Sequence, residues 1–117
     1  MGDTGYSVLM SVYFKENPEF LRQSMESIYN QTISTDNFVL VCDGYLNAGL
    51  YKVIEEQKKK FREVLKVIQL EKNCGLGNAL NEGMKHCRHE FVARMDSDDI
   101  SFPERCERQL EAFKDRT

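Results

Sequence analysis

Three carboxylates occur within four positions of the sequence, at Asp96, Asp98 and Asp99, directly after an apolar run that begins at Phe91. Carboxylates about 4 to 6 Å apart near a protein surface repel one another by on the order of a kcal/mol or more, so such a group favours a cationic partner. Asp96 and Asp98 project to the same side of an extended strand end, and Mg²⁺ or Mn²⁺ is commonly held by one or two carboxylates. The spacing predicts a divalent-metal site, although aspartates here could also cap the following helix.

Other residues that could contact a ligand follow other apolar runs. Asp43 precedes Gly44, as in a turn, but its carboxylate could also accept hydrogen bonds from a nucleobase or a ribose. Gly75 and Gly77 open a predicted helix, where they allow either a tight turn or a close approach of the backbone to a ligand. Tyr13 could stack on a base or belong to the core. The local sequence leaves each pair of alternatives open.

The elements that must position these residues can be read from the apolar pattern. Runs of strand length alternate with segments whose apolar residues recur at helical spacing. The expected strands are 7–13, 38–42, 64–70 and 91–95. The expected helices are 18–29, opened by the Asn17-Pro18 pair, 50–61, one that opens at 75–77 with an apolar stripe from Leu76 to Cys87, and one after Pro103. This alternation predicts an α/β fold with a mostly parallel sheet covered by helices. Ligands bind beyond the carboxyl ends of such strands, so Tyr13, Asp43 and the 96–99 cluster should meet at one edge.

Composition narrows the class of protein. The 117 residues are 41% apolar and 30% charged with two prolines, which is typical of one ordinary globular domain. A net charge of −3 gives no general attraction for nucleic acid, so we expect no nucleic-acid partner. We see no transmembrane segment and no secretory signal, which makes a cytoplasmic location the expectation. Four cysteines without paired spacing are expected to be reduced thiols.

Three familiar motifs fit poorly. The 86–89 stretch, His-Cys-Arg-His, has zinc-ligand residue types but poor spacing and no second half. An EF-hand loop starting at Asp96 would place Ser101 where a glycine is required. A dinucleotide fingerprint starting at Gly75 would place Leu80 where a small residue belongs.

Taken in order, six blocks of the chain resemble the donor-binding half of the family 2, GT-A-fold inverting glycosyltransferases. The blocks are Ser7-Val-Leu-Met-Ser-Val-Tyr13, Ser27-Ile-Tyr-Asn-Gln-Thr32, Val41-Cys-Asp-Gly44, Asn73-Cys-Gly-Leu-Gly77, Ala79-Leu-Asn-Glu-Gly83 and Met95-Asp-Ser-Asp-Asp-Ile-Ser-Phe-Pro103. They cover nearly the whole chain from Tyr6 to Phe113. The resemblance implies a Rossmann-like (GT-A) three-layer sandwich, truncated after its nucleotide-binding part. Residues 1–5 would form an N-terminal tail, and residues 6–117 the nucleotide-sugar-binding part of a GT-A domain without its acceptor-binding part.

The resemblance also implies roles for single residues. Ser11, Val12 and Tyr13 would line the nucleotide pocket, Asp43 would hold the base, and Gly75 and Gly77 would lie near the nucleotide. Asp96, Ser97 and Asp98 would form the DxD motif. Asp98 or Asp99 would touch the metal, and Asp96 and Ser97 would lie nearer the ribose or sugar. Asp96 is a further candidate for the metal. This chain departs from many relatives in having Cys42 before Asp43 and Leu80 where an arginine is common, which puts the donor's identity in doubt.

The implied activity is inverting transfer of a sugar from a nucleoside diphosphate, a UDP-sugar being favoured, to a hydroxyl group of a saccharide or lipid-linked acceptor. Such a reaction serves polysaccharide or glycoconjugate synthesis, with Mn²⁺ or Mg²⁺ as cofactor and peripheral association with the inner face of the membrane. Inversion needs a general base, which in the family lies well beyond the DxD segment. We therefore expect no catalytic residue within this chain and place the base beyond Thr117.

Two other functional classes remain as alternatives. One is a non-catalytic nucleotide- or metal-binding α/β module. The other is a phosphatase or receiver-like domain with Asp96 or Asp43 as phosphoryl acceptor, for which a lysine or threonine at another strand end would be expected and none is convincingly placed.

Overall fold

The first apolar run forms the centre of the sheet. In the computed structural model, which describes residues 5–115, β1 (Ser7–Val12) pairs in parallel with strands on both sides. The sheet order is β3-β2-β1-β4, and the other strands are β2 (Asn37–Cys42), β3 (Leu65–Gln69) and β4 (Val92–Asp96). All three pairings are parallel, as the alternation of strand and helix predicts.

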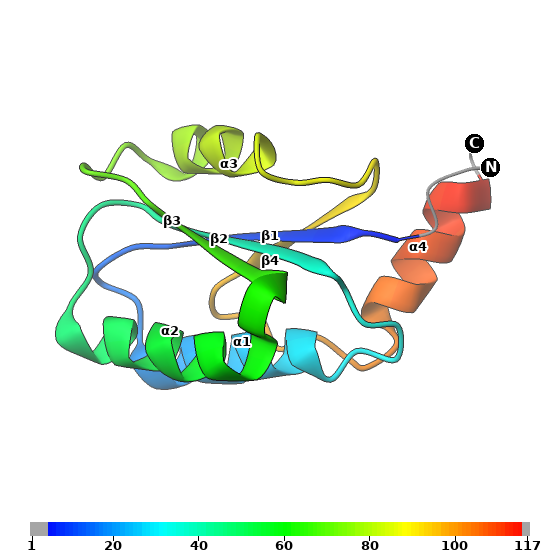
Figure 1. Cartoon of the computed structure of the whole chain (residues 1–117), viewed down its shortest axis with the longest axis horizontal. Helices are drawn as coiled ribbons and strands as arrows, with labels where there is room; N and C mark the ends of the chain where they lie inside the picture. Colours follow the sequence, from blue (N-terminus) through cyan, green and yellow to red (C-terminus); the bar gives the residue numbers. More distant parts are fainter. Residues whose placement is uncertain (1–4, 116–117) are drawn as a thin grey trace.

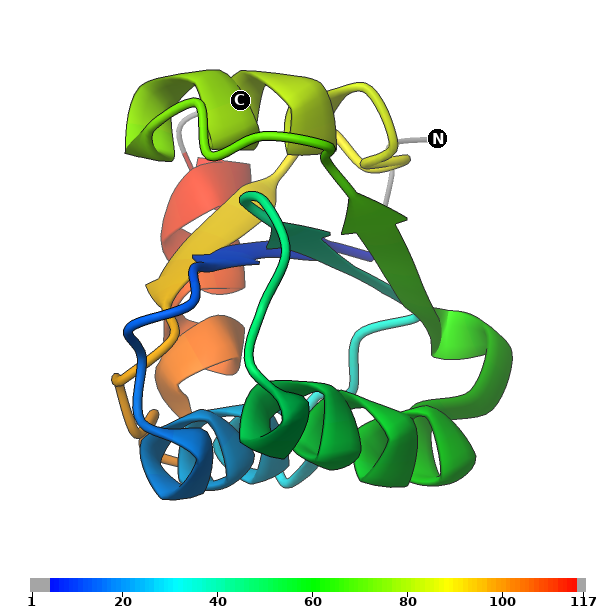
Figure 2. The same cartoon turned by 90° about the vertical axis from the view of Figure 1, so that its left-hand side faces the viewer.

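Strand register aligns the carboxyl ends of the three strands that carry the candidate site. Val12 pairs with Cys42 of β2, and Ser11 pairs with Asp96 of β4. Figure 2 looks onto this edge, where the loops that leave the strands lie toward the viewer. Residues that follow β1, β2 and β4 are therefore brought together although they are far apart in the sequence.

Helices cover both faces of the sheet (Figure 1). The helices α1 (Pro18–Tyr29) and α2 (Ala48–Phe61) lie side by side on one face, and α3 (Leu76–Met84) lies on the other. The larger core lies on the α1 and α2 side, whereas the α3 side buries a smaller cluster of Leu9, Val39, Val41 and Ala79. These three layers confirm the predicted α/β sandwich.

The last helix, α4 (Arg105–Asp115), lies beside β4 rather than in either layer (Figure 1). Its buried Cys106 and Leu110 join the larger core. Phe113 also stacks on Phe91, with ring centroids 5.2 Å apart. The segment between β4 and α4 is consequently anchored at both of its ends.

Local sequence signals explain where the first two helices begin. Asn17 accepts hydrogen bonds from the Glu19 and Phe20 amides, and Pro18 follows it, as the sequence predicts. The second helix begins at Ala48, earlier than expected, because Asn47 caps it by accepting from the Leu50 amide at 2.9 Å.

Several predicted boundaries were wrong by a few residues. The strand expected from Val64 begins at Leu65, because 62–64 forms a 3-10 turn in which Arg62 has a φ of 56°. The helix α3 ends at Met84, and although Cys87 beyond it still packs with Ala79, as the predicted stripe requires, Leu76 at the start is 58% exposed. The predicted tail 1–5 lies outside the described residues except for Gly5. Within residues 5–115, no helix is both long and apolar enough to cross a membrane.

Candidate functional site

A cleft of about 380 Å³ opens at the carboxyl ends of the strands, where the parallel topology predicts a ligand site. Residues from four separate parts of the chain line it: Ser11, Tyr13, Glu16, Asp43, Asn73, Gly75, Leu76, Asp96, Ser97 and Asp98. The structure thus brings together most of the residues singled out in the sequence. Val12, Gly77 and Asp99 are not among those that line the cleft.

The three aspartates come together through a turn at the end of β4. The Asp99 amide donates to the Asp96 carbonyl at 3.1 Å, which reverses the chain directly after the strand. One carboxylate oxygen from each of Asp96, Asp98 and Asp99 lies within 4.8 Å of the other two. An extended strand end would have separated Asp99 from the others, so the turn is what completes the cluster. A donor set of hard carboxylate oxygens fits Mg²⁺ or Mn²⁺.

Asp43 has the turn role that its sequence left open, while its role toward a nucleobase or ribose stays a prediction. It is 5% exposed, its Oδ1 accepts from the Cys74 amide at 2.7 Å, and its own amide donates to the Val12 carbonyl. Gly44 has a φ of 88°, and a Cβ there would lie 2.7 Å from the Asn73 nitrogen, so the turn needs glycine. The Cys74 thiol also interacts with the Asp43 carboxylate, which lines the cleft.

The start of α3 forms another wall of the cleft. Gly75 is the N-cap of α3 with a φ of 91°, and a Cβ at this position would meet no atom within 4 Å. The positive φ explains the glycine through backbone conformation, while the open space around it leaves room for a ligand. Gly77 lies inside the helix, also with open space beside it.

The residues at the end of β1 divide between core and cleft. Val12 is 1% exposed and its side chain belongs to the core, whereas Tyr13 is 40% exposed and lines the cleft. Ser11 lines it as well. Ser97 is 4% exposed, lines the cleft, and its hydroxyl has no hydrogen-bond partner among the described residues.

Sequence reasoning missed three lining residues, Glu16, Asn73 and Leu76. Glu16 is brought back to the cleft by a turn in which its amide donates to the Tyr13 carbonyl at 3.1 Å. Asn73 and Leu76 flank Gly75, so the glycine-rich opening of α3 was the signal that could have found them. Leu76 had instead been assigned to the apolar stripe of the helix.

Cys74 is the cysteine nearest the cleft. Desolvation and then its interaction with the Asp43 carboxylate raise the pKa of its thiol above the ordinary value. Because the nucleophilic form of cysteine is the thiolate, the raised pKa disfavours a role for Cys74 as a nucleophile.

Comparison with known proteins gives this arrangement a family context. The family model described as glycosyl transferase family 2 matches residues 7–117. An uncharacterized glycosyltransferase of Haemophilus influenzae is 50% identical over 105 residues, which is 90% of this chain and 39% of that protein. An Escherichia coli UDP-Gal:alpha-D-GlcNAc-diphosphoundecaprenol beta-1,3-galactosyltransferase is 41% identical over 102 residues, or 87% of this chain and 36% of that protein. The chain thus spans about two fifths of the length of these curated relatives.

Solved structures match the fold over nearly the whole chain. S. aureus TarS 1–349 in complex with UDP-GlcNAc superposes with a TM-score of 0.78 at 29% identity, covering 96% of this chain and 31% of that one. The mannosyltransferase PcManGT from Pyrobaculum calidifontis, in complex with GDP-Man and Mn²⁺, shares the fold at a TM-score of 0.77 and 20% identity, covering 93% of this chain and 31% of that one. The four-stranded parallel sheet is therefore the Rossmann-like sheet of GT-A transferases, and the predicted resemblance is confirmed: this chain belongs to glycosyl transferase family 2.

Proposed function

We propose that the cleft binds a nucleoside-diphosphate sugar, a UDP-sugar being favoured, as the donor-binding part of an inverting glycosyltransferase. One observation carries the proposal: three carboxylates have oxygens within 4.8 Å of one another, and two of them, Asp96 and Asp98, line the same cleft as Asp43 and Ser97. Asp43 and Ser97 are both almost fully buried, and both line the cleft. A few polar side chains that converge on a cleft are typical of a ligand site, which supports the proposal.

The nucleoside would occupy the side of the cleft formed by β1, β2 and the start of α3. Asp43 accepts hydrogen bonds from N–H groups of the base, of which uracil is the favoured example. Tyr13, half exposed beside it, stacks on the base, and Ser11 lines the pocket, whereas Val12 adjoins the pocket from the core. Gly75 leaves space for the nucleotide, and Gly77 lies behind it in α3. The open backbone at both glycines supports this placement.

The diphosphate and sugar would lie toward the carboxylate turn. We assign metal binding to Asp98 and Asp99 with Asp96, in a DxD motif in which Asp96 and Ser97 lie nearer the ribose or sugar. A bound Mn²⁺ or Mg²⁺ would neutralise the negative charge that develops on the departing nucleoside diphosphate. The chain's own residues hold the donor and fix the direction in which its diphosphate points.

Transfer also needs an acceptor and a base, which we assign to other parts of a longer protein. The general base is proposed beyond Thr117, and residues 6–117 are proposed as the nucleotide-sugar-binding part. The E. coli relative is named for a diphosphoundecaprenol-linked sugar, which supports a lipid-linked or saccharide acceptor in glycoconjugate synthesis. A cytoplasmic site of action, at the membrane face where such an acceptor is met, forms part of the same proposal.

Calorimetric titration tests the donor site. UDP, GDP and dTDP are each titrated into the wild type and into Asp98→Ala, with and without Mn²⁺. We expect UDP to bind most tightly, Mn²⁺ to strengthen its binding, and Asp98→Ala to remove that strengthening. Absence of nucleotide binding, or binding indifferent to both metal and substitution, would refute the donor site. Adding the 117-residue chain to a UDP-sugar and a hydroxyl acceptor tests the missing base, since sugar transfer by this chain alone would contradict that assignment.

A further inference from the structure

One face of α1 holds the backbone on both sides of the carboxylate turn. The Ser24 hydroxyl donates to the Asp96 carbonyl at 3.1 Å, and the Ser27 hydroxyl accepts from the Ser101 amide at 3.0 Å. Ser24 and Ser27 are three residues apart on the helix, so they share a face beside the apolar stripe that packs into the core. The strand end before the turn and the loop after it are therefore tied to the same element.

Gln31, just beyond the end of α1, adds a third attachment. It is 5% exposed, and its side-chain nitrogen donates to the Phe102 carbonyl at 2.8 Å and to the Ser27 carbonyl at 3.0 Å. Its side-chain oxygen accepts from the Cys106 amide at 2.8 Å. Cys106 is the second residue of α4, where backbone N–H groups have no partner within the helix. One glutamine thus anchors the loop and caps the helix that follows it.

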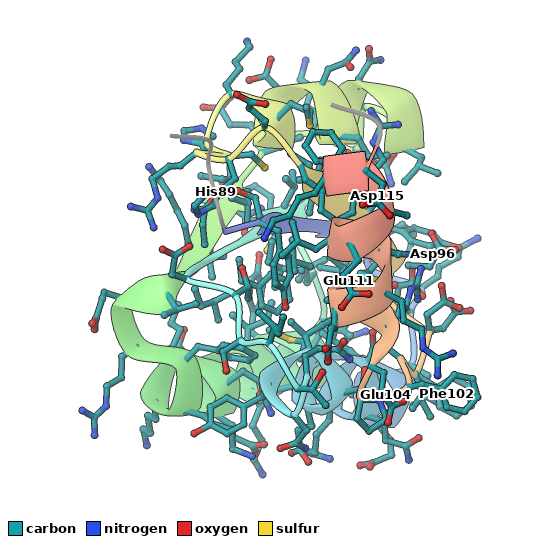
Figure 3. The ribbon with its side chains drawn as sticks, turned by 90° about the vertical axis from the view of Figure 1, so that its right-hand side faces the viewer. His89, Asp96, Phe102, Glu104, Glu111 and Asp115 are labelled. Carbon is teal, nitrogen blue, oxygen red and sulfur yellow. The ribbon has the colours of Figure 1, made fainter. Side chains whose placement is uncertain are left out.

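These attachments dominate the contacts of the loop that follows the turn, residues 97–104. Among the described residues, the hydrogen bonds of this loop to elements other than β4 and α4 all involve Ser27, Gln31 or Thr32. The Thr32 amide donates to the Pro103 carbonyl at 2.7 Å. The Phe102 side chain itself is 80% exposed and points away from the molecule in Figure 3. The loop is therefore held through its backbone, by α1 and by Gln31 and Thr32 just after it, and not by its larger side chains.

These attachments oppose the repulsion among the three carboxylates of the turn. Three carboxylates held within 4.8 Å repel one another, and a free loop would relax by moving them apart. We propose that Ser24, Ser27 and Gln31 are positioning residues, which hold the turn in the geometry that binds the divalent cation. This inference rests on the proposed function, and it assigns control of metal affinity to a helix that contributes no residue to the lining of the cleft.

The direct test replaces Gln31 by methionine, which keeps the length and volume of the side chain but removes both polar ends. In calorimetry with UDP present, the affinity of Gln31→Met for Mn²⁺ should fall about 10- to 100-fold, the range typical of residues that orient metal ligands. UDP binding without metal should change less than about twofold. The matched control is Gln57→Met, because Gln57 is also buried, at 2% exposure, but bonds to Glu26 and not to the loop. Its Mn²⁺ affinity should stay that of the wild type.

A conservative pair separates positioning from general stability. Ser27→Ala removes the acceptor of the Ser101 amide, whereas Ser27→Thr keeps a hydroxyl at the same place. Ser27→Ala should weaken Mn²⁺ binding about 10-fold and Ser27→Thr should restore most of it. If Gln31→Met and Ser27→Ala lower the stability but leave Mn²⁺ affinity unchanged, their role is structural only and the proposal is overturned.

Amide hydrogen exchange in the absence of metal tests whether Ser27 and Gln31 hold the turn, and it does so whether or not the proposed function is right. In Gln31→Met the Ser101 and Cys106 amides should exchange at least about 10-fold faster, while amides within α2 keep their protection. If the wild type binds neither UDP nor Mn²⁺, the proposed function fails, and exchange at these amides then decides whether α1 holds the turn. Unchanged exchange at both amides would refute the positioning role whatever the wild type binds.

Discussion

Polar residues gather at both ends of the parallel sheet, but only at one end do they satisfy each other. At the amino end, the Asn37 side-chain oxygen accepts from the Ser7 hydroxyl at 2.5 Å and from the Arg88 amide at 2.9 Å. His89 contacts the Asp36 carboxylate at 2.6 Å, and the Arg88 guanidinium donates to the Asp36 carbonyl. Figure 3 shows His89 and Asp96 on opposite flanks of the molecule.

At the carboxyl end the three carboxylates of the 96–99 cluster have no such partners. The structure gives the side chains of Asp96, Asp98 and Asp99 no hydrogen bond or ion pair among the described residues, and they lie close to one another. A group of polar residues that pairs internally contributes to stability, whereas one that leaves like charges together costs stability until a ligand joins it. We infer from this contrast that the amino-end cluster is structural and that the carboxyl-end cluster binds a ligand, and four predictions test the inference.

The largest effect is expected from removing one carboxylate at each end. Asp98→Asn should weaken UDP binding in the presence of Mn²⁺ at least about 100-fold, because a bound cation is worth several kcal/mol and each 1.4 kcal/mol is a factor of about ten. Asp36→Asn, the matched change at the amino end, should leave UDP affinity within about twofold. Calorimetry on both variants measures this, and equal losses would erase the distinction between the two ends.

Removing the central acceptor at the amino end should have the next largest effect, and on stability. Asn37→Ala leaves the buried Ser7 hydroxyl without its acceptor and the Arg88 amide with only the Ser7 oxygen, at 3.2 Å, and should lower the free energy of unfolding by about 2 kcal/mol. Asn73→Ala at the exposed cleft, where the side chain accepts only from the Gly75 amide, should cost about 0.5 kcal/mol or less. Urea denaturation compares them, and a larger loss for Asn73→Ala would contradict the comparison.

A third prediction concerns Cys42, which lies at the carboxyl end but faces the core. Burial raises the pKa of its thiol to about 11 from 9.0, so the folded protein keeps this proton to higher pH than the unfolded chain. The unfolded state then binds fewer protons between these values, and stability falls as pH rises through them, by on the order of 2 kcal/mol from this group. Cys42→Ala should show a correspondingly smaller loss between about pH 8 and about pH 11 in urea denaturation. An equal loss in both proteins would mean that the thiol is not the source.

The smallest expected effect is a change in the free energy of unfolding that has opposite signs at the two ends of the sheet. Without metal, Asp98→Asn should raise the free energy of unfolding by about 0.5 kcal/mol because it relieves repulsion within the cluster. Asp36→Asn should lower it by a similar amount, about 0.5 kcal/mol, because it weakens the contacts to His89 and Arg88. Thermal unfolding in a chelating buffer measures both, and destabilisation by Asp98→Asn would show that this carboxylate supports the fold.

Much of the fold was predictable because its signals are local. Apolar runs of strand length located all four strands to within one or two residues, and the Asn17-Pro18 pair located the start of α1. The parallel order follows from the alternation of strands and helices, and this order predicts that Asp43 lies at the same edge as the aspartate cluster. Residue type and order were sufficient here because each signal acts within a few residues or through a general topological rule.

The details of the site depended on contacts that no local pattern encodes. Asp99 joins Asp96 and Asp98 only because the chain turns after β4, and Val12 faces the core while Tyr13 faces the cleft. The partners of the turn lie on α1, more than seventy residues earlier in the sequence. By itself, the sequence determined which residues could bind a cation and a nucleotide. The tertiary structure decided how closely the carboxylates meet and what holds them there, because opposing their repulsion requires backbone contacts between distant segments.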